Sequence, residues 1–300
     1  MERVQLTENI SFSRMVQGFW RLAEWDMSKE EILSFTEQCI ELGITTFDHA
    51  DIYGDYTCEA LFGEVLKSKP SLRDSMQLVT KCGIKLLSEK YPKRTVKHYD
   101  TSKEHIIASV ESSLQKIGTD YVDVLLIHRP DPFMDPAEVA EAFTKLRQEG
   151  KVLAFGVSNF LPSQFEMLSA YLDFPLVTNQ IEISVMQLEH FANGTIEKCQ
   201  EKRIHPMAWS PLSGGRLFSD RSRNTQFIKN DLSKVGKEIG AASFDQVMYA
   251  WLLAHPAGII PINGSGKIER IRSAVKATKL SMNRHQWFEI YESAVGHEVP

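Results

Sequence analysis

The sequence predicts a (β/α)8 barrel, the TIM-barrel form of the α/β class, built as one domain over residues 1–300. Short apolar or β-branched runs alternate with amphipathic stretches of ten or more residues, and about eight such units follow one another. No Pro/Ser-rich linker or low-complexity segment divides them. Near-continuous apolar strands indicate a parallel sheet covered by helices, and eight units favour a closed barrel over a doubly wound sheet.

Eight runs are the candidate barrel strands. Each is short, rich in apolar or β-branched residues and bounded by polar residues or glycine. A hairpin-like segment, VQLTENISF, comes before the first of them. In chain order the candidate strands are 15–18, 44–49, 76–83, 122–128, 152–160, 177–184, 205–212 and 258–264.

Helix signals fall between these runs. Ser28 and Glu31 form a capping box ahead of the first helix, and Gly43 ends it. Thr101 and Glu104 predict a second capping box ahead of IIASVESSLQKIG. Other helices are expected at 58–67, within PAEVAEAFTKLRQEG, after Pro162 and at 195–203.

Two connections, 84–100 and 213–229, are long for a compact domain. Both follow strands, on the face where barrels place their active sites. Loops of this length are usually functional or mobile, so we expect both to border the site.

Composition excludes several classes of protein. The net charge of −5 argues against general nucleic-acid binding, which usually shows as a basic surplus. The four cysteines are scattered, without the spacing of a disulfide framework or a zinc site, so no metal is expected. The N-terminus has no signal-like apolar region, and no apolar run approaches the length of a membrane helix. We expect a cytoplasmic protein without membrane or nucleic-acid partners.

Polar residues end most of the predicted strands, and in a barrel these ends meet at one rim. They are Asp48, Lys81, His128, Ser158, Asn159, Gln180 and Ser210. Each follows a buried apolar run, which a solvated surface position would not explain. The pattern therefore predicts a functional site at the rim.

Four residues of this rim could together reduce a carbonyl. Tyr53 has an ordinary pKa near 10, and a nearby Lys81 ammonium is expected to lower it. Asp48 would keep Lys81 charged by pairing with it. His128 could donate a hydrogen bond to a carbonyl oxygen. Together they form a general acid aimed at a developing alkoxide.

Several motifs carry a resemblance to a known family. GITTFDHADIYG is similar to the aldo-keto reductase signature, and VTKCG, LLIHRPD, FGVSNF, NQIE and AWSPLSGG resemble later blocks of that superfamily in the same order. The stretch from PINGSGKIER to the end is most similar to the bacterial YdhF-like oxidoreductase branch. This resemblance, over about residues 10–300, implies that Tyr53 is the proton donor, tuned by Asp48 and Lys81, with His128 orienting the carbonyl.

The resemblance also implies NADPH as the cofactor. Its carboxamide would bind Ser158, Asn159 and Gln180, and its nicotinamide would stack on Trp209, where the family commonly has tyrosine. Ser210, Leu212 and Arg216 would lie along the pyrophosphate, and Ser265, Lys267 and Arg270 match the region that binds the 2′-phosphate. The chain departs from the family at His49, where serine or threonine is common, and in the block that contacts adenine. No GxGxxG follows an early strand, so a Rossmann route to the dinucleotide is not supported.

Phe19 and Trp20 follow the first predicted strand and could wall a substrate pocket for a small carbonyl compound. Two other functions remain open. Lys81 could form a Schiff base in an aldolase. Alternatively, the chain could bind NADPH with little turnover, as do aldo-keto reductase relatives that act as cofactor-sensing subunits of membrane proteins. The natural carbonyl, the reaction direction and the oligomeric state, monomer or weak oligomer, are not determined by the sequence.

Overall fold

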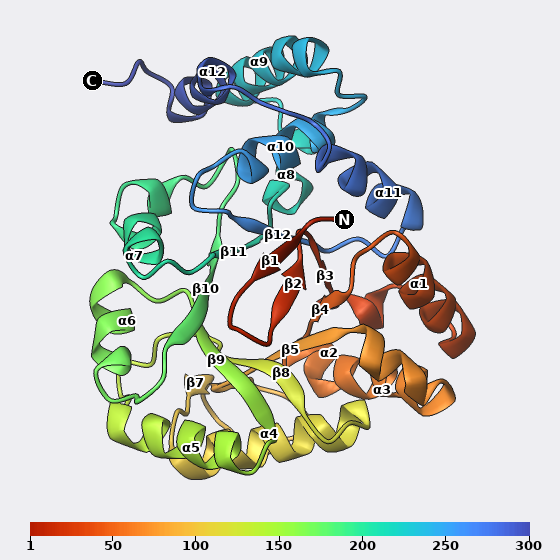
Figure 1. The fold of residues 1–300 in the computed structure, drawn as a ribbon, viewed down its shortest axis with the longest axis vertical. Coiled ribbons are helices and arrows are strands. Elements are labelled where there is room, and N and C mark those ends of the chain that lie inside the picture. The colour runs from red at the N-terminus through yellow and green to blue at the C-terminus, as the bar shows by residue number, and fades with distance from the viewer.

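Eight parallel strands close into a barrel in the computed structural model, which describes residues 1–300 (Figure 1). Around the barrel the order is β10-β11-β12-β3-β4-β5-β8-β9, and β9 pairs with β10 to close the ring. The predicted (β/α)8 fold is confirmed, and each of the eight predicted runs overlaps one barrel strand. The strands are β3 (Val16–Gly18), β4 (Thr46–Asp48), β5 (Gln77–Cys82), β8 (Val122–Ile127), β9 (Val152–Ser158), β10 (Leu176–Glu182), β11 (Met207–Trp209) and β12 (Ile260–Asn263).

Helices surround the barrel on its outside (Figure 1). The helices of the ring are α1 (Lys29–Glu41), α3 (Cys58–Ser68), α4 (Lys103–Ile117), α5 (Pro136–Gln148), α6 (Pro162–Ser169), α7 (Thr195–Glu201), α10 (Phe244–Leu253) and α11 (Ile268–Ala277). Two further helices, α9 (Arg223–Ile239) and α12 (Arg284–Val295), pack on each other at the outer edge of the ring. Short turns of helix are α2 (Tyr53–Tyr56), α8 (Arg216–Ser219), η1 (Leu22–Glu24), η2 (Pro70–Ser75), η3 (Glu189–Phe191) and η4 (Ser213–Gly215). None of these helices combines the length and the apolar character needed to cross a bilayer.

The N-terminal hairpin, β1 (Arg3–Gln5) with β2 (Ser11–Ser13), closes one end of the barrel. The Arg3 guanidinium donates to Thr45 Oγ1 at 2.8 Å and to Gln77 Oε1 at 2.9 Å, where β4 and β5 begin. Phe12 is completely buried among the residues inside the barrel. Because the hairpin covers the end where strands begin, a ligand can approach the interior only from the end where they finish.

Alternation along the strands delivers polar groups to that open end. In β5, Val79 packs in the apolar cluster inside the barrel, and Lys81 points the same way two residues later. In β8, Val124 and Leu126 belong to the same cluster, and His128 follows them. The interior is therefore apolar in its lower layers and polar at its C-terminal rim.

The first capping box is present as predicted, because Ser28 and Glu31 exchange side-chain to backbone hydrogen bonds. The second is wrong by one residue. Ser102, not Thr101, caps α4 by accepting from the His105 amide. The Thr101 hydroxyl instead donates to Asp131 at 2.9 Å, a contact 30 residues away.

The two long connections are more ordered than the sequence suggested. Segment 84–100 begins and ends in a two-stranded sheet, β6 (Ile84–Lys85) with β7 (His98–Tyr99). Segment 213–229 is not one loop, because Ser222 caps α9 and the helix starts at Arg223. The apolar spacing at Ile228, Leu232 and Val235 was visible in the sequence and belongs to the buried face of that helix.

Candidate active site

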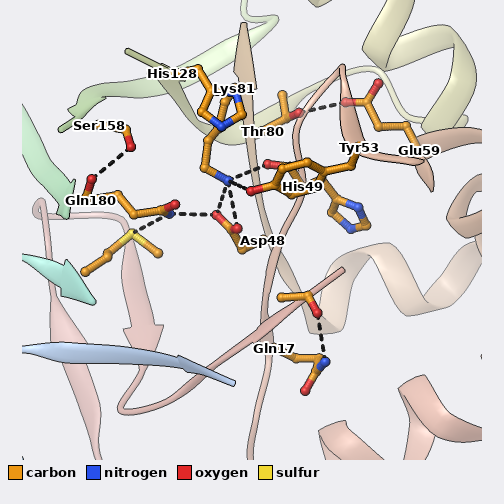
Figure 2. A network of polar contacts seen from close by, with 12 residues as sticks. Gln17, Asp48, His49, Tyr53, Glu59, Thr80, Lys81, His128, Ser158 and Gln180 are labelled. Carbon is orange, nitrogen blue, oxygen red and sulfur yellow. Dashed lines mark hydrogen bonds and ion pairs between the residues drawn. The ribbon is translucent and has the colours of Figure 1, made fainter. Parts of the chain in front are cut away.

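Lys81 is the centre of a hydrogen-bonded group at the open end of the barrel (Figure 2). Its Nζ lies 2.8 and 2.7 Å from the two carboxylate oxygens of Asp48 and 2.7 Å from the His49 carbonyl oxygen. The Tyr53 hydroxyl oxygen accepts from the same nitrogen at 3.0 Å. The Lys81 side chain is completely buried and that of Asp48 nearly so. Burial lowers the pKa of the Lys81 ammonium, and pairing with Asp48 opposes this effect and favours the charged form.

Tyr53 is placed to donate its proton outward. Its oxygen already accepts from Lys81, and no group of the chain accepts its hydroxyl proton, which leaves that proton for a ligand. Burial raises the pKa of the phenol well above its ordinary value, and the Asp48 carboxylate raises it further. The expectation that Lys81 lowers this pKa is therefore wrong for the protein alone, because loss of water and a facing carboxylate outweigh the ammonium.

His128 lies beside the phenol as a neutral ring. The ring centroids of His128 and Tyr53 are 5.8 Å apart, with the rings edge to face. Burial lowers the pKa of His128 well below its ordinary value, with Lys81 and Arg129 adding to the effect. Nδ1 is buried without a partner. A neutral imidazole with one N–H can donate a hydrogen bond to a carbonyl oxygen but does not compete with Tyr53 as the acid.

A chain of polar contacts joins Trp209 to Asp48. The indole Nε1 of Trp209 donates to Asn159 Oδ1 at 3.0 Å, and Asn159 Nδ2 donates to Ser158 Oγ at 2.8 Å. Ser158 Oγ donates to the Gln180 carbonyl, and Gln180 Nε2 donates to Asp48 Oδ1, both at 2.8 Å. Asn159 has a φ of 61°, a left-handed conformation that asparagine adopts more readily than most residues. The structure thus brings these predicted residues together next to the Lys81 group.

The loop after β11 has an unusual backbone. Ser210 and Ser213 have φ values of 49° and 56°, and Gly214 and Gly215 have 62° and 86°. A Cβ added at either glycine would meet no atom within 4 Å, so their role is conformational. Leu212, in the middle of the loop, packs partly buried against two core clusters. Arg216 follows, exposed, with its Nε donating to the Ser213 carbonyl at 3.2 Å.

Ser265, Lys267 and Arg270 gather at the N-terminus of α11. Lys267 is the N-cap residue, and its amide donates to Ser265 Oγ at 3.1 Å. Lys267 and Arg270 are exposed and form no ion pair, whereas Arg272 in the same helix pairs with Glu269. Two unpaired cations at a helix N-terminus fit a phosphate, which such a terminus also attracts through its free N–H groups.

Phe19 and Trp20, the two residues expected to wall a substrate pocket, differ in their burial. Phe19 is completely buried and stacks on His49, with ring centroids 5.0 Å apart, and on Phe47. It is a core residue with no exposed surface to wall a pocket, so that expectation is wrong. Trp20 is 56% exposed, and its ring lies 6.4 Å from that of Tyr53, at the edge of the site.

Sequence reasoning missed two buried carboxylates beneath the site. Ser109 and Ser113, one turn apart in α4, donate to Asp51 and Glu59 at 2.8 and 3.0 Å. Burial, together with the nearby Glu59 carboxylate, raises the pKa of Asp51 to about 7. Their negative charges favour the Lys81 ammonium. The only available signal was the acidic residue between two apolar ones in HADIYG.

Arg129 was also missed, although it follows His128 directly. Its guanidinium carbon lies 5.6 Å from the centre of the Trp209 ring, and it forms no ion pair. Figure 2 shows the neighbouring Lys81 group from close by, with dashed lines joining the Lys81 ammonium to Asp48 and Tyr53. A free cation and an indole therefore lie at the rim next to the acid group.

Comparisons with known proteins find oxidoreductases and aldo-keto reductases as relatives. The model of the Aldo/keto reductase family matches residues 14–294. The chain is 56% identical to the uncharacterized oxidoreductase YcsN of Bacillus subtilis, with all of both chains covered, and 51% identical to the oxidoreductase YdhF of Escherichia coli, with 96% of each covered. It is 47% identical to a 6-dehydroglucose reductase of Agrobacterium fabrum over the full length of both. A crystal structure of the thermostable aldo-keto reductase Tm1743 with the inhibitor epalrestat superposes with a TM-score of 0.81 at 25% identity, covering 98% of this chain and 100% of that one. The resemblance to the YdhF-like branch is confirmed.

Proposed function

This chain belongs to the aldo/keto reductase family, and we propose that it is a single-domain, NADPH-dependent reductase of small aldehydes or ketones. The observation that carries the proposal is the contact of the Tyr53 hydroxyl with the buried Lys81–Asp48 pair, at the one open end of the barrel. A phenol held there by a donor to its oxygen can give its proton only outward, toward a ligand.

Each of the four residues then has a chemical role. When bound, NADPH supplies a hydride to the carbonyl carbon. Tyr53 donates its proton to the oxygen as negative charge develops there. Lys81 and Asp48 hold the phenol in place, and His128 donates a hydrogen bond that orients the carbonyl.

The residues present fit the proposed cofactor. Gln180, fixed by its bond to Asp48, keeps its carbonyl oxygen for a carboxamide N–H. Trp209, fixed by Asn159, offers the flat face of its ring. The unpaired cations Lys267 and Arg270 suit a 2′-phosphate, which NADPH carries and NADH lacks. The loop from Ser210 to Arg216 would lie along the pyrophosphate.

The substrate class follows from the rim and from one relative. Arg129 and Trp20 place a guanidinium and an indole beside the acid group. A guanidinium can hydrogen-bond several hydroxyl groups, and an indole face can cover a sugar ring. Because a relative at 47% identity is a 6-dehydroglucose reductase, we include the aldehyde of a hexose among the proposed substrates. The enzyme would act in the cytoplasm, where its four free cysteines, all buried, stay reduced.

A Schiff-base role for Lys81 fits the geometry less well. The Lys81 side chain is fully buried, and its ammonium contacts four oxygen atoms. A nucleophilic amine must be neutral and accessible. Borohydride reduction in the presence of a carbonyl substrate should therefore leave Lys81 unmodified.

The direct test uses wild-type protein and the Tyr53→Phe variant. NADPH absorbance is followed in single turnover against a panel of aldehydes, ketones and a hexose 6-aldehyde, with NADPH and NADH affinities measured by fluorescence quenching. We expect the variant to bind NADPH as the wild type does and to lose about 10²- to 10⁴-fold in rate, the usual contribution of a general acid. Wild-type protein that binds NADPH but never oxidises it would instead be a cofactor sensor. Equal turnover by wild type and variant would refute the proposed role of Tyr53.

A further inference from the structure

The backbone is left-handed directly after Tyr53. Gly54, Asp55 and Tyr56 have φ values of 57°, 51° and 67°. These angles suit glycine, but an L-residue adopts them at an energetic cost, and two such residues in succession persist only where other contacts hold them. At Gly54 a side chain would not fit, because its Cβ would lie 2.6 Å from Cys58 Sγ. The turn that carries Tyr53 is therefore strained and needs external support.

Segment 84–100 supplies that support to Tyr56. The Tyr56 hydroxyl oxygen accepts from the Leu86 amide at 2.9 Å and from Arg94 Nη1 at 2.7 Å. The Tyr91 ring packs edge-on against the Tyr56 ring at 4.9 Å. The Arg94 guanidinium carbon lies 3.7 Å from the centre of the Tyr91 ring. Three residues of one segment thus converge on one left-handed residue.

The same segment also holds Asp55. Ser88 Oγ donates to Asp55 Oδ2 at 3.0 Å, and the Lys90 ammonium donates to the Asp55 carbonyl oxygen. Both non-glycine residues of the turn are therefore held by side chains or amides of segment 84–100. This segment begins two residues after Cys82, where β5 ends, so it continues from the strand that delivers Lys81.

We propose that segment 84–100 is a brace for the proton donor and that Tyr56 is its positioning residue. Through the Tyr56 hydroxyl, the brace fixes the turn after Tyr53 relative to the strand that carries Lys81. It thereby maintains the 3.0 Å contact between the Tyr53 hydroxyl and the Lys81 ammonium. The inference rests on the proposed role of Tyr53 as the acid and extends it to a residue outside the site.

The brace also couples specificity to chemistry. Segment 84–100 follows a barrel strand and so borders the open end where the substrate enters. A substrate that moves this segment moves Asp55 and Tyr56, and with them the phenol. Good substrates should therefore differ from poor ones in kcat as well as in KM.

The test compares Tyr56→Phe with a matched control, Tyr91→Phe. The first keeps the ring, and hence the packing on Tyr91, but removes the oxygen that accepts two hydrogen bonds. The control removes a hydroxyl from the same aromatic pair that forms no hydrogen bond in the structure. Tyr53→Phe and wild type are measured beside them with NADPH and one carbonyl substrate.

We expect Tyr56→Phe to lower kcat by about 100-fold, the effect of a misplacement near 1 Å at a reacting group, with the Kd for NADPH unchanged. Tyr91→Phe should stay within about twofold of wild type. Hydrogen exchange of the Gly54–Thr57 amides, which needs no turnover, should become faster in Tyr56→Phe only.

Two outcomes would overturn the brace. One is a kcat for Tyr56→Phe equal to that of Tyr91→Phe while wild type is active and Tyr53→Phe is not. The other is unchanged exchange of the Gly54–Thr57 amides in Tyr56→Phe. If wild type reduces no carbonyl or Tyr53→Phe is fully active, the proposed function fails, and the exchange measurement still decides whether the brace exists.

Discussion

Replacing Lys81 by methionine should lower both the turnover and the free energy of unfolding. Methionine keeps the length of the side chain and removes the ammonium that contacts Asp48, His49 and Tyr53. The Asp48 carboxylate is then buried with only the Gln180 amide as a donor. A buried charge without its partner is strongly destabilising.

The size of the effect follows from burial and chain length. Breaking a buried ion pair by removing one partner costs about 3–5 kcal/mol. With an unfolding entropy of about 2.1 cal/mol/K per residue, a loss of about 4 kcal/mol in a chain of 300 residues lowers Tm by about 6 °C. Turnover should fall by at least about 100-fold, because the phenol loses the group that holds it.

A second variant separates the two effects. In Lys81→Met/Asp48→Asn the unpaired charge is gone, and the asparagine oxygen can still accept from Gln180. We expect the free energy of unfolding to recover most of the loss, while turnover stays as low as in Lys81→Met. Thermal unfolding by circular dichroism and single-turnover oxidation of NADPH give the two readings.

Either of two results would contradict a buried, charged Lys81–Asp48 pair that holds Tyr53. A Tm for Lys81→Met within about 1 °C of wild type would mean that the Lys81–Asp48 pair is not a buried, charged interaction. Turnover restored by the double variant would mean that the ammonium has no part in holding Tyr53. Far-UV spectra at low temperature provide the control that every variant is folded.

Three further predictions concern other parts of the molecule. Burial lowers the pKa of His49 to about 3, so below about pH 6.5 this residue binds a proton in the unfolded chain but not in the folded one. Acidification to pH 4 should therefore lower the free energy of unfolding of the wild type by about 3 kcal/mol through His49 alone. His49→Phe should lack this decrease, which urea unfolding at a series of pH values measures. The double variant Lys267→Ala/Arg270→Ala should weaken NADPH binding by at least about tenfold and leave NADH binding unchanged, as measured by fluorescence titration. Equal losses of affinity for the two nucleotides would contradict a 2′-phosphate site. Gly266→Ala should destabilise by about 1–3 kcal/mol, because its Cβ would lie 2.5 Å from a tryptophan ring, whereas Gly264→Ala, with nothing within 4 Å, should leave the urea midpoint unchanged.

The strands and the rim were predictable because they depend on local pattern. Each barrel strand is an apolar run that ends in a polar residue, and parallel strands bring those ends together whatever the loops do. Asp48 and Lys81 were found for this reason. The same pattern predicted Gln180 at the rim. In the structure this residue lies two strands from His128 on the closed ring and donates to Asp48 in the Lys81 group.

The failures depend on contacts distant in sequence. Thr101 and Ser102 are both good cap residues, and a hydrogen bond from Thr101 to Asp131 decides between them. Phe19 follows the end of β3 and could face either way, and the aromatic residues of later elements draw it into the core. The support of Tyr56 by Arg94 joins side chains 38 residues apart, and no local pattern indicates it.

The pH dependence of the rates in the two directions follows from the charge around Tyr53. Reduction needs a protonated phenol, whereas oxidation of an alcohol needs a phenolate to accept the proton. Burial and Asp48 raise the pKa of Tyr53, so the phenol is protonated at neutral pH and only a small fraction can act as a base. We therefore expect kcat/KM for reduction to be constant between about pH 7 and 9, and kcat/KM for alcohol oxidation to rise about tenfold per pH unit over the same range. Initial rates of reduction and of oxidation, measured in one buffer series, test this. The control is the Kd for NADPH measured at each pH. A reduction rate that falls above about pH 7 would show that the Lys81 ammonium outweighs burial after all.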